Sequence, residues 1–155
     1  MIIDIHGHYT TAPAPLGQWR DAQAAALTDP VQAPDPAGPV ISDDQIRESV
    51  ETNQLRLMDE RGIDVTVFSP RASFMAHHIG DFATSSAWAR ICNDLCHRVS
   101  ELYPDRFVPG AMLPQSPGVD PAPWSRRSSG PYGTWERSPS TSTRIPAVAT
   151  GPRPL

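Results

Sequence analysis

The chain has 155 residues, of which 39% are hydrophobic and 19% are charged, and its formal net charge at pH 7 is −4. This length predicts one domain, and no apolar run is long enough to predict a helix that spans a membrane. The N-terminus lacks the basic and apolar regions of a signal peptide, and two cysteines are too few for a disulfide scaffold. We therefore expect a cytoplasmic protein without a membrane partner.

The chain divides after Asp120 into two parts of different composition. Residues 1–120 contain 8 arginines and 16 acidic residues, whereas residues 121–155 contain 5 arginines and a single acidic residue. The second part is rich in proline and serine and has no helical or strand periodicity. Its arginines form no helical face and are not interleaved with aromatic residues, which argues against nucleic-acid binding. We expect a folded domain over 1–120 and an irregular tail over 121–155.

The first predicted element is a short buried strand, Ile2–Ile5, which leads directly into His6 and His8. Residues 9–40 contain six prolines, which exclude a long regular element. We expect an irregular loop there, with room for a short helix over Gln18–Thr28.

The clearest helix signal begins at Ser42, whose hydroxyl can cap the first turn while Gln45 completes a capping box. One face of this helix carries a recurring set of side chains: Ile46, Val50, Asn53, Leu57 and Met58. Gly62 is a typical C-terminal stop. The β-branched segment Ile63–Phe68 then predicts a second strand, which ends at the Ser-Pro pair that follows it.

A loop over residues 69–83 precedes a second helix, for which Thr84 or Ser85 is the expected N-cap. The apolar side chains of this helix recur at spacings of three and four residues: Trp88, Ile91, Cys92, Leu95, Val99 and Leu102. Pro104 ends the helix, and Phe107–Leu113 predicts a third strand. The order β-loop-α-β-loop-α-β favours an α/β fold with a parallel sheet and crossover helices.

Cys92 and Cys96 lie four residues apart on the second helix, a spacing that by itself is compatible with a metal site or a redox switch. Because Cys92 belongs to the apolar stripe, we favour a buried core thiol. Asp94 and His97 lie on other faces of the helix and are expected to be solvated.

Polar residues follow each predicted strand, and the carboxyl ends of parallel strands meet at one edge of a sheet, where ligands bind. The residues expected at this rim are His6, His8, Arg71, His77, His78 and Gln115. Side chains two apart on a strand point the same way, so both imidazoles of His6 and His8 can reach one cation. Asp4 lies deeper on the same face and could orient a histidine. The alternative is two polar residues at the start of an exposed loop.

Several segments resemble the amidohydrolase superfamily and, within it, a branch of decarboxylases and hydratases. Asp4-Ile5-His6-Gly7-His8 is similar to the strand-one motif of the superfamily. Residues 61–64 and 93–114 are similar to the decarboxylase/hydratase branch. Residues 1–9 and 69–78 most resemble its 4-oxalomesaconate hydratases. The resemblance covers about residues 1–120.

The resemblance implies a (β/α)8 TIM barrel, of which residues 1–120 would be the βαβαβ N-terminal portion, truncated before the later strands. It also implies a Zn²⁺ site in which His6 and His8 are the first two ligands. In the superfamily the other ligands are typically a histidine near strand five and an acidic residue near strand eight. Neither has a counterpart in this sequence.

The activity implied by the resemblance is addition of water to an unsaturated tricarboxylic acid in the breakdown of aromatic compounds. Arg71 is a candidate for binding a substrate carboxylate, since a guanidinium matches that group, or is a solvated loop residue. His77 and His78 are candidates for substrate binding or for acid–base chemistry, or are polar surface, and no catalytic residue is assigned. The alternatives are a related metal-dependent decarboxylase or hydrolase, and a truncated product without activity. The full-length family can form homo-oligomers.

The composition of residues 121–155 has two interpretations. One is a disordered linker rich in proline, serine and arginine. The other is a coding frame displaced by one lost nucleotide near codons 120–124. Reading the third base of each codon with the first two of the next, Ser140–Pro152 permits the string NLNPDPSGGHWT, which resembles the same hydratases. We favour the displaced frame, and expect this chain to be inactive as it stands.

Overall fold

The structure is a computed structural model that describes residues 1–71, 76 and 78–118. Its elements, in chain order, are β1 (Ile3–Tyr9), α1 (Ala14–Ala25), η1 (Pro30–Gln32), α2 (Asp43–Val50), η2 (Glu51–Leu55), α3 (Arg56–Arg61), β2 (Val65–Pro70), α5 (Phe82–Leu102) and β3 (Phe107–Pro109). The predicted irregular tail over 121–155 lies outside the described residues.

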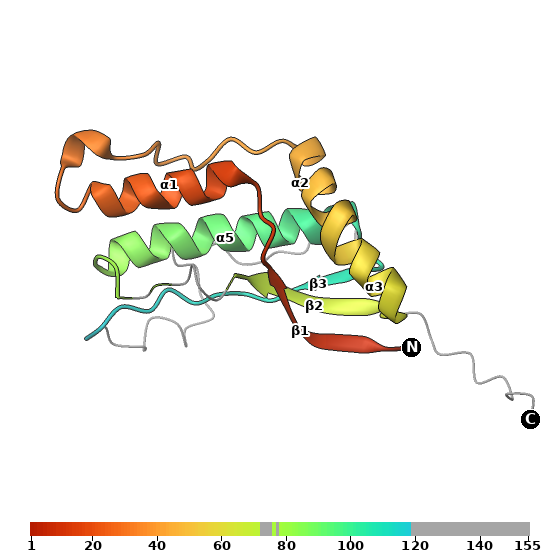
Figure 1. The fold of residues 1–155 in the computed structure, drawn as a ribbon. Coiled ribbons are helices and arrows are strands. Elements are labelled where there is room, and N and C mark those ends of the chain that lie inside the picture. The colour runs from red at the N-terminus through yellow and green to blue at the C-terminus, as the bar shows by residue number, and fades with distance from the viewer. Residues whose placement is uncertain (72–75, 77, 119–155) are drawn as a thin grey trace, which may run out of the picture.

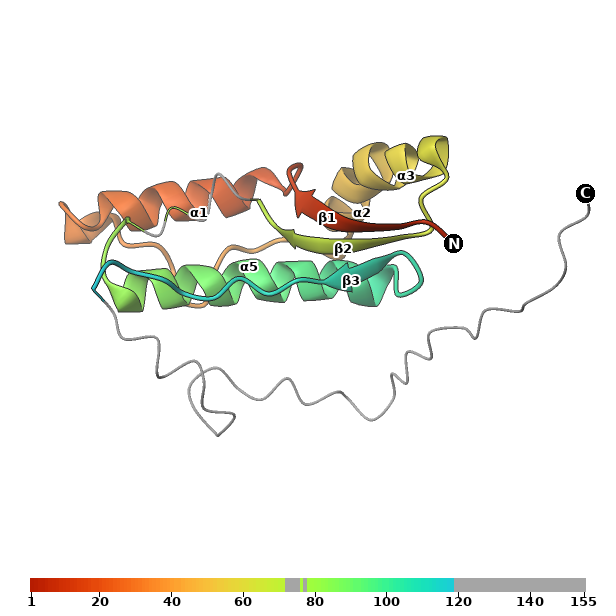
Figure 2. The same ribbon diagram turned by 90° about the horizontal axis from the view of Figure 1, so that it is seen from below.

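The three strands form one parallel sheet in the order β1-β2-β3. Figures 1 and 2 show the described helices gathered on one face of this sheet, with α1 and α5 running side by side. Alternate residues of β2, namely Thr66, Phe68 and Pro70, are buried, whereas the residues between them are half-buried. The expected α/β arrangement with parallel strands is therefore confirmed for the described part of the chain.

Helix α1 corrects the expectation of an irregular segment over residues 9–40, and it begins four residues before the short helix considered at Gln18–Thr28. Proline is tolerated here because Pro13 is the N-cap and Pro15 lies in the first turn. The backbone N–H groups of a first turn have no acceptor within the helix, so the missing N–H of proline costs no helical hydrogen bond. The helix buries one face through side chains spaced three and four residues apart: Leu16, Trp19, Arg20 and Gln23.

The capping box at Ser42 is confirmed: Gln45 N–H donates to Ser42 Oγ, and Ser42 N–H donates to Gln45 Oε1. Gly62 ends α3 with φ of 66°, the left-handed conformation expected for a C-terminal glycine.

Between Ser42 and Gly62 the chain does not form the single α-helix that was predicted, because the π-helical turn η2 separates α2 from α3. Val50 and Leu55 are five residues apart, and a π turn brings such a pair onto one face. Leu55 packs against the core, while Asn53 and Leu57, expected on the buried face, are half-buried.

Helix α5 begins at Phe82 and is capped by Asp81, not by Thr84 or Ser85. Asp81 Oδ1 accepts hydrogen bonds from the Thr84 backbone N–H (2.9 Å) and hydroxyl (2.8 Å). These bonds hold the pKa of the Asp81 carboxyl below its usual value. Ser85 is buried instead, and its hydroxyl donates to the Gln115 carbonyl. The helix starts earlier than predicted because the Asp81 carboxylate, and not a hydroxyl of Thr84 or Ser85, accepts the hydrogen bond from the backbone N–H of the first turn.

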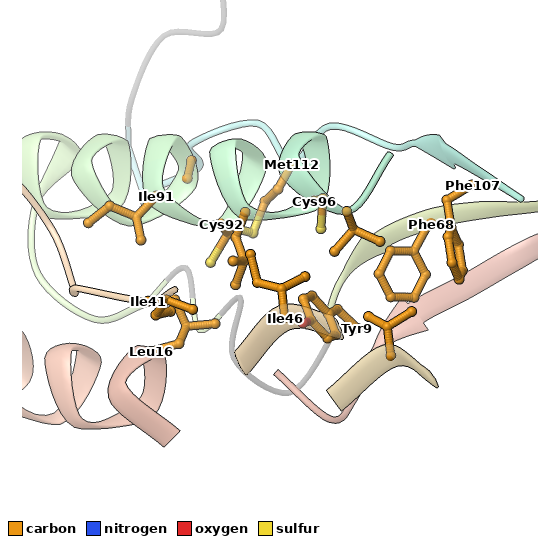
Figure 3. Close-up of a cluster of buried hydrophobic side chains, with 14 of the residues drawn as sticks. Tyr9, Leu16, Ile41, Ile46, Phe68, Ile91, Cys92, Cys96, Phe107 and Met112 are labelled. Carbon is orange, nitrogen blue, oxygen red and sulfur yellow. The ribbon is translucent and has the colours of Figure 1, made fainter. Parts of the chain in front are cut away.

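The predicted apolar stripe of α5 forms the centre of the core (Figure 3). Trp88 and Val99 are 1% and 0% exposed, and Cys92 and Cys96 are buried free thiols. Burial raises the pKa of Cys92, and it raises the pKa of Cys96 to about 12. The prediction of a buried Cys92 thiol is confirmed. Asp94 and His97 lie outside the stripe, and their side chains are 61% and 44% exposed.

Strand β3 is shorter than the predicted Phe107–Leu113 and ends at Pro109. Directly after Pro109, the Gly110 N–H still donates to the Phe68 carbonyl of β2 (2.7 Å). Beyond it, the chain is held to α5 by a side chain: Asn93 Oδ1 accepts from Met112 N–H (2.8 Å), and Asn93 Nδ2 donates to the Met112 carbonyl (2.9 Å). The backbone of Met112 therefore bonds to a helix side chain.

None of the helices in the described part of the chain combines the length and the apolar character needed to cross a membrane.

Candidate metal-binding site at the end of strand β1

The His6-Gly7-His8 segment lies inside β1, because this strand continues to Tyr9 and does not end at Ile5 as expected. The pairing with β2 shifts between Asp4 and Gly7, which marks a bulge or irregularity in the ladder. Asp4 Oδ1 accepts a hydrogen bond from the His6 backbone N–H (3.0 Å) across this irregularity. Asp4 therefore stabilises the backbone that carries the histidines, a role different from the contact with a histidine ring considered from the sequence.

Gly7 allows β1 to approach β2 closely. A Cβ atom at position 7 would lie 2.2 Å from Thr66 Cγ2 and 3.0 Å from the Val67 carbonyl oxygen. A side chain at the first of these distances requires the Thr66 side chain or the strands to shift. The glycine between the two histidines is therefore a packing requirement of the sheet.

The two imidazole rings meet at their Nε2 atoms, which are 3.2 Å apart, with the ring planes at 87°. Two zinc–nitrogen bonds of about 2.0–2.1 Å that meet at a tetrahedral angle separate their nitrogens by roughly 3.3 Å. The side chains of His6 and His8 therefore fit a shared divalent cation. His6 is exposed and His8 is half-buried, so the pair is accessible from solvent.

The other ring nitrogen of His8 contacts β2. His8 Nδ1 lies 2.9 Å from the Pro70 carbonyl oxygen and 2.8 Å from Ser69 Oγ. Ser69 Oγ also donates to the Gly7 carbonyl (2.9 Å). The two contacts with β2 therefore hold the His8 ring through Nδ1, whereas His6 Nδ1 makes no comparable bond within the described residues.

Tyr9 anchors the end of β1 to the helix layer. Its side chain is 2% exposed, and its hydroxyl is 2.6 Å from Ser49 Oγ on α2. Because Ser49 Oγ donates to the Ile46 carbonyl (2.8 Å), Tyr9 is the donor to Ser49. Desolvation raises the pKa of Tyr9 to about 12. The neutral phenol is therefore a structural contact beside the histidine pair.

The structure places the predicted substrate residues differently from one another. Arg71 is exposed and follows Pro70 at the carboxyl end of β2, where it lines a small, mostly apolar pocket with Tyr9 and Leu16. His78 is exposed in the turn before α5, and His77 lies outside the described residues. Gln115 is exposed beyond β3. Substrate binding by Arg71, His77 and His78 stays a prediction.

Within residues 1–71, 76 and 78–118, no third His, Cys, Asp or Glu joins the two histidines to complete a metal-binding group. The donor set available here is two neutral nitrogens, which is half of a four-coordinate zinc site.

Sequence reasoning did not find the contact of His8 with Ser69 and Pro70. Ser69 lies directly opposite His8 in the strand register, and Pro70 lies opposite Tyr9. Once the offset between β1 and β2 is known, the contact between His8 and Ser69 can be predicted, since opposed residues on neighbouring strands share a face. The sequence indicated both strands but not their offset.

Comparison with known proteins shows the family to which this chain is similar and individual relatives within it. Residues 3–129 match the family described as Amidohydrolase. Over 120 residues the chain is 53% identical to 2-keto-4-carboxy-3-hexenedioate hydratase from Sphingobium sp. (strain NBRC 103272 / SYK-6). The aligned segment covers 77% of this chain and 35% of that protein. The crystal structure of 4-oxalomesaconate hydratase from Rhodopseudomonas palustris matches with a TM-score of 0.73 and 60% identity, over 78% of this chain and 36% of that chain. The chain thus spans about a third of the length of these relatives.

Proposed function

Because this chain belongs to the amidohydrolase family, we propose that it is the metal-binding N-terminal portion of a zinc-dependent hydratase. The observation that carries the proposal is the 3.2 Å approach of the His6 and His8 Nε2 atoms at the carboxyl end of β1. The two similar hydratases support the reaction class, which is addition of water to an unsaturated polycarboxylic acid in aromatic-compound degradation. The substrate we propose is 4-oxalomesaconate or a close tricarboxylic acid.

Each residue of the site has a defined task in this proposal. His6 and His8 hold the metal through Nε2, and Asp4 keeps the backbone of the irregular segment in place. Bound zinc supplies a Lewis acid that polarises the substrate or a water molecule. Arg71, exposed at the end of the neighbouring strand, binds a substrate carboxylate through its guanidinium. His77 and His78, which follow in the same connection, are proposed to contact the remaining polar groups of the substrate.

We further propose that the complete protein is a (β/α)8 barrel and that residues 121–155 are read in a displaced frame. Apolar side chains left exposed on β1 and β3 support this: Ile3, Ile5 and Val108 are 52%, 79% and 48% exposed. All-parallel sheets are normally covered on both faces. Further strands would cover these residues and bring the missing metal ligands, so the present chain is proposed to have no turnover.

Metal binding tests the first part of the proposal. Equilibrium dialysis of the 155-residue chain against Zn²⁺ should show weak binding that His6→Ala abolishes. His97→Ala is the matched control, since His97 is a partly exposed histidine on α5, remote from β1 in the sequence, whose Nε2 pairs with Glu101. Equal zinc binding by the His6→Ala and His97→Ala variants would refute the site.

Repair of the frame tests the second part. One nucleotide restored near codon 121 should extend the reading beyond codon 155 and give a protein that hydrates 4-oxalomesaconate. In that protein His6→Ala and His8→Ala should abolish turnover, and Arg71→Ala should mainly raise KM. Release of carbon dioxide, or hydrolysis of a C–N bond, in place of water addition would favour the related decarboxylase or hydrolase. A stop codon soon after the repair would refute the displaced frame.

A further inference from the structure

We propose that Ser69 is a positioning residue that, together with the Pro70 carbonyl, fixes the tautomer of His8 so that its Nε2 presents a lone pair to the metal. The inference rests on the proposed metal site and adds a residue to it. Ser69 touches neither metal nor substrate in this proposal and acts through His8.

The direction of each hydrogen bond follows from which atoms can donate. The Pro70 carbonyl oxygen is an acceptor, so the contact of 2.9 Å with His8 Nδ1 requires a proton on Nδ1. The Gly7 carbonyl is likewise an acceptor, so the Ser69 hydroxyl donates to it across 2.9 Å. The Ser69 oxygen then offers its lone pairs to His8 Nδ1 at 2.8 Å. Two acceptors therefore surround one ring nitrogen.

The consequence lies on the opposite side of the ring. A neutral imidazole protonated at Nδ1 carries a lone pair at Nε2, which is the atom 3.2 Å from His6 Nε2. In the metal-free chain His6 Nε2–H donates to that lone pair. A cation placed between the rings finds His8 already in the correct tautomer and orientation, and contacts of this type commonly tune metal ligands.

Strand register explains why Ser69 can do this. Ser69 is paired with His8, so the two side chains lie on the same face of the sheet. After Tyr9 the chain turns, with Thr10 N–H donating to the His8 carbonyl (2.8 Å). The Pro70 carbonyl, at the end of the ladder, accepts from the imidazole.

Nitrogen NMR of the imidazole rings tests the inference without activity and without metal. In the 155-residue chain, at a pH where His8 is neutral, the ¹⁵N shifts of His8 should report a proton on Nδ1 and none on Nε2. Ser69→Ala should shift only part of the His8 population to the other tautomer, because the Pro70 carbonyl still accepts from Nδ1, while Ser69→Thr, which keeps the hydroxyl, should restore the wild-type pattern. Ser100→Ala is the matched control, because Ser100 also donates to a backbone carbonyl, that of His97 (2.7 Å).

Zinc dialysis of the same variants completes the test. Ser69→Ala should weaken zinc binding by about tenfold, the lower end of the range for such partners, because the Pro70 carbonyl remains. Ser69→Thr and Ser100→Ala should bind as the wild type does. A wild-type His8 protonated on Nε2, or a Ser69→Ala variant that matches Ser100→Ala in tautomer and zinc affinity, would overturn the inference. A Ser69-dependent tautomer in a chain that binds no zinc would uphold the role of Ser69 and refute the metal site.

Discussion

The two faces of the β1-β2-β3 sheet differ in how completely they are covered. On the helix-covered face, Tyr9, Phe68 and Phe107 are 2%, 1% and 2% exposed, and they pack together as tilted aromatic rings (Figure 3). Other apolar side chains of the same strands are not covered by the helices: Ile5 and Val108 are 79% and 48% exposed. The described part of the chain thus has a finished core on one side of the sheet.

The largest effect is expected from a substitution on the covered face. Phe68→Ala should lower the free energy of unfolding by about 3–5 kcal/mol, because it removes a fully buried ring. Val67→Ala, one residue away on the other face and half-buried, should lower it by about 1 kcal/mol or less. Urea denaturation measures both. Equal losses would show that the two faces are equally covered in solution.

Alkaline pH should also act through the covered face. The pKa of Cys96 is raised by burial from 9.0 to about 12, and that of Tyr9 from 10.0 to about 12. Because the folded values exceed the unfolded ones, the stability these groups contribute is fully present below about pH 9 and is lost as the pH rises toward 12. Thermal melting across this range should show a falling midpoint. A midpoint unchanged up to pH 12 would contradict the burial of both groups.

Much of the helix-covered face could be predicted from the sequence, since local signals determine it. The Ser42 capping box, the Gly62 stop and the stripe from Trp88 to Val99 each rest on short-range spacing. The site could be predicted in part: the residue spacing indicated that His6 and His8 converge. Their supporting contacts depend on the offset between β1 and β2, which joins residues about sixty positions apart and leaves no local pattern.

Two errors have a physical lesson in common. Proline content predicted a loop where α1 forms, because the position of a proline relative to a helix start matters more than the number of prolines. A regular α-helix was predicted where η2 is a π turn, and the Leu55 side chain at the end of that turn packs against the core. In both cases the burial of one helix face outweighs the local signal.

Gly7 lies between the two histidines of the candidate site and packs closely against β2, so its replacement tests the sheet packing at the site itself. Gly7→Ala should destabilise the chain by about 1–3 kcal/mol, since the new Cβ would overlap Thr66 Cγ2 and the Thr66 side chain or the strands would have to shift. Gly17→Ala, at an open position inside α1, should be neutral or stabilise by up to about 1 kcal/mol. Urea denaturation compares the two. A Gly7→Ala variant as stable as Gly17→Ala would mean that β1 and β2 are not in close contact.

The smallest change in stability is expected on the uncovered side, where the effect should appear in association. Ile5→Ser should alter the free energy of unfolding by about 0.5 kcal/mol or less, because the side chain is 79% exposed. β1 is nevertheless an edge of the described sheet, and exposed apolar edge strands promote pairing between chains. Sedimentation velocity should therefore show less self-association for Ile5→Ser than for the wild type. Val31→Ser, at a 92% exposed position in η1, should leave association unchanged. Equal association of all three proteins would show that the uncovered face is not the surface through which the chains meet.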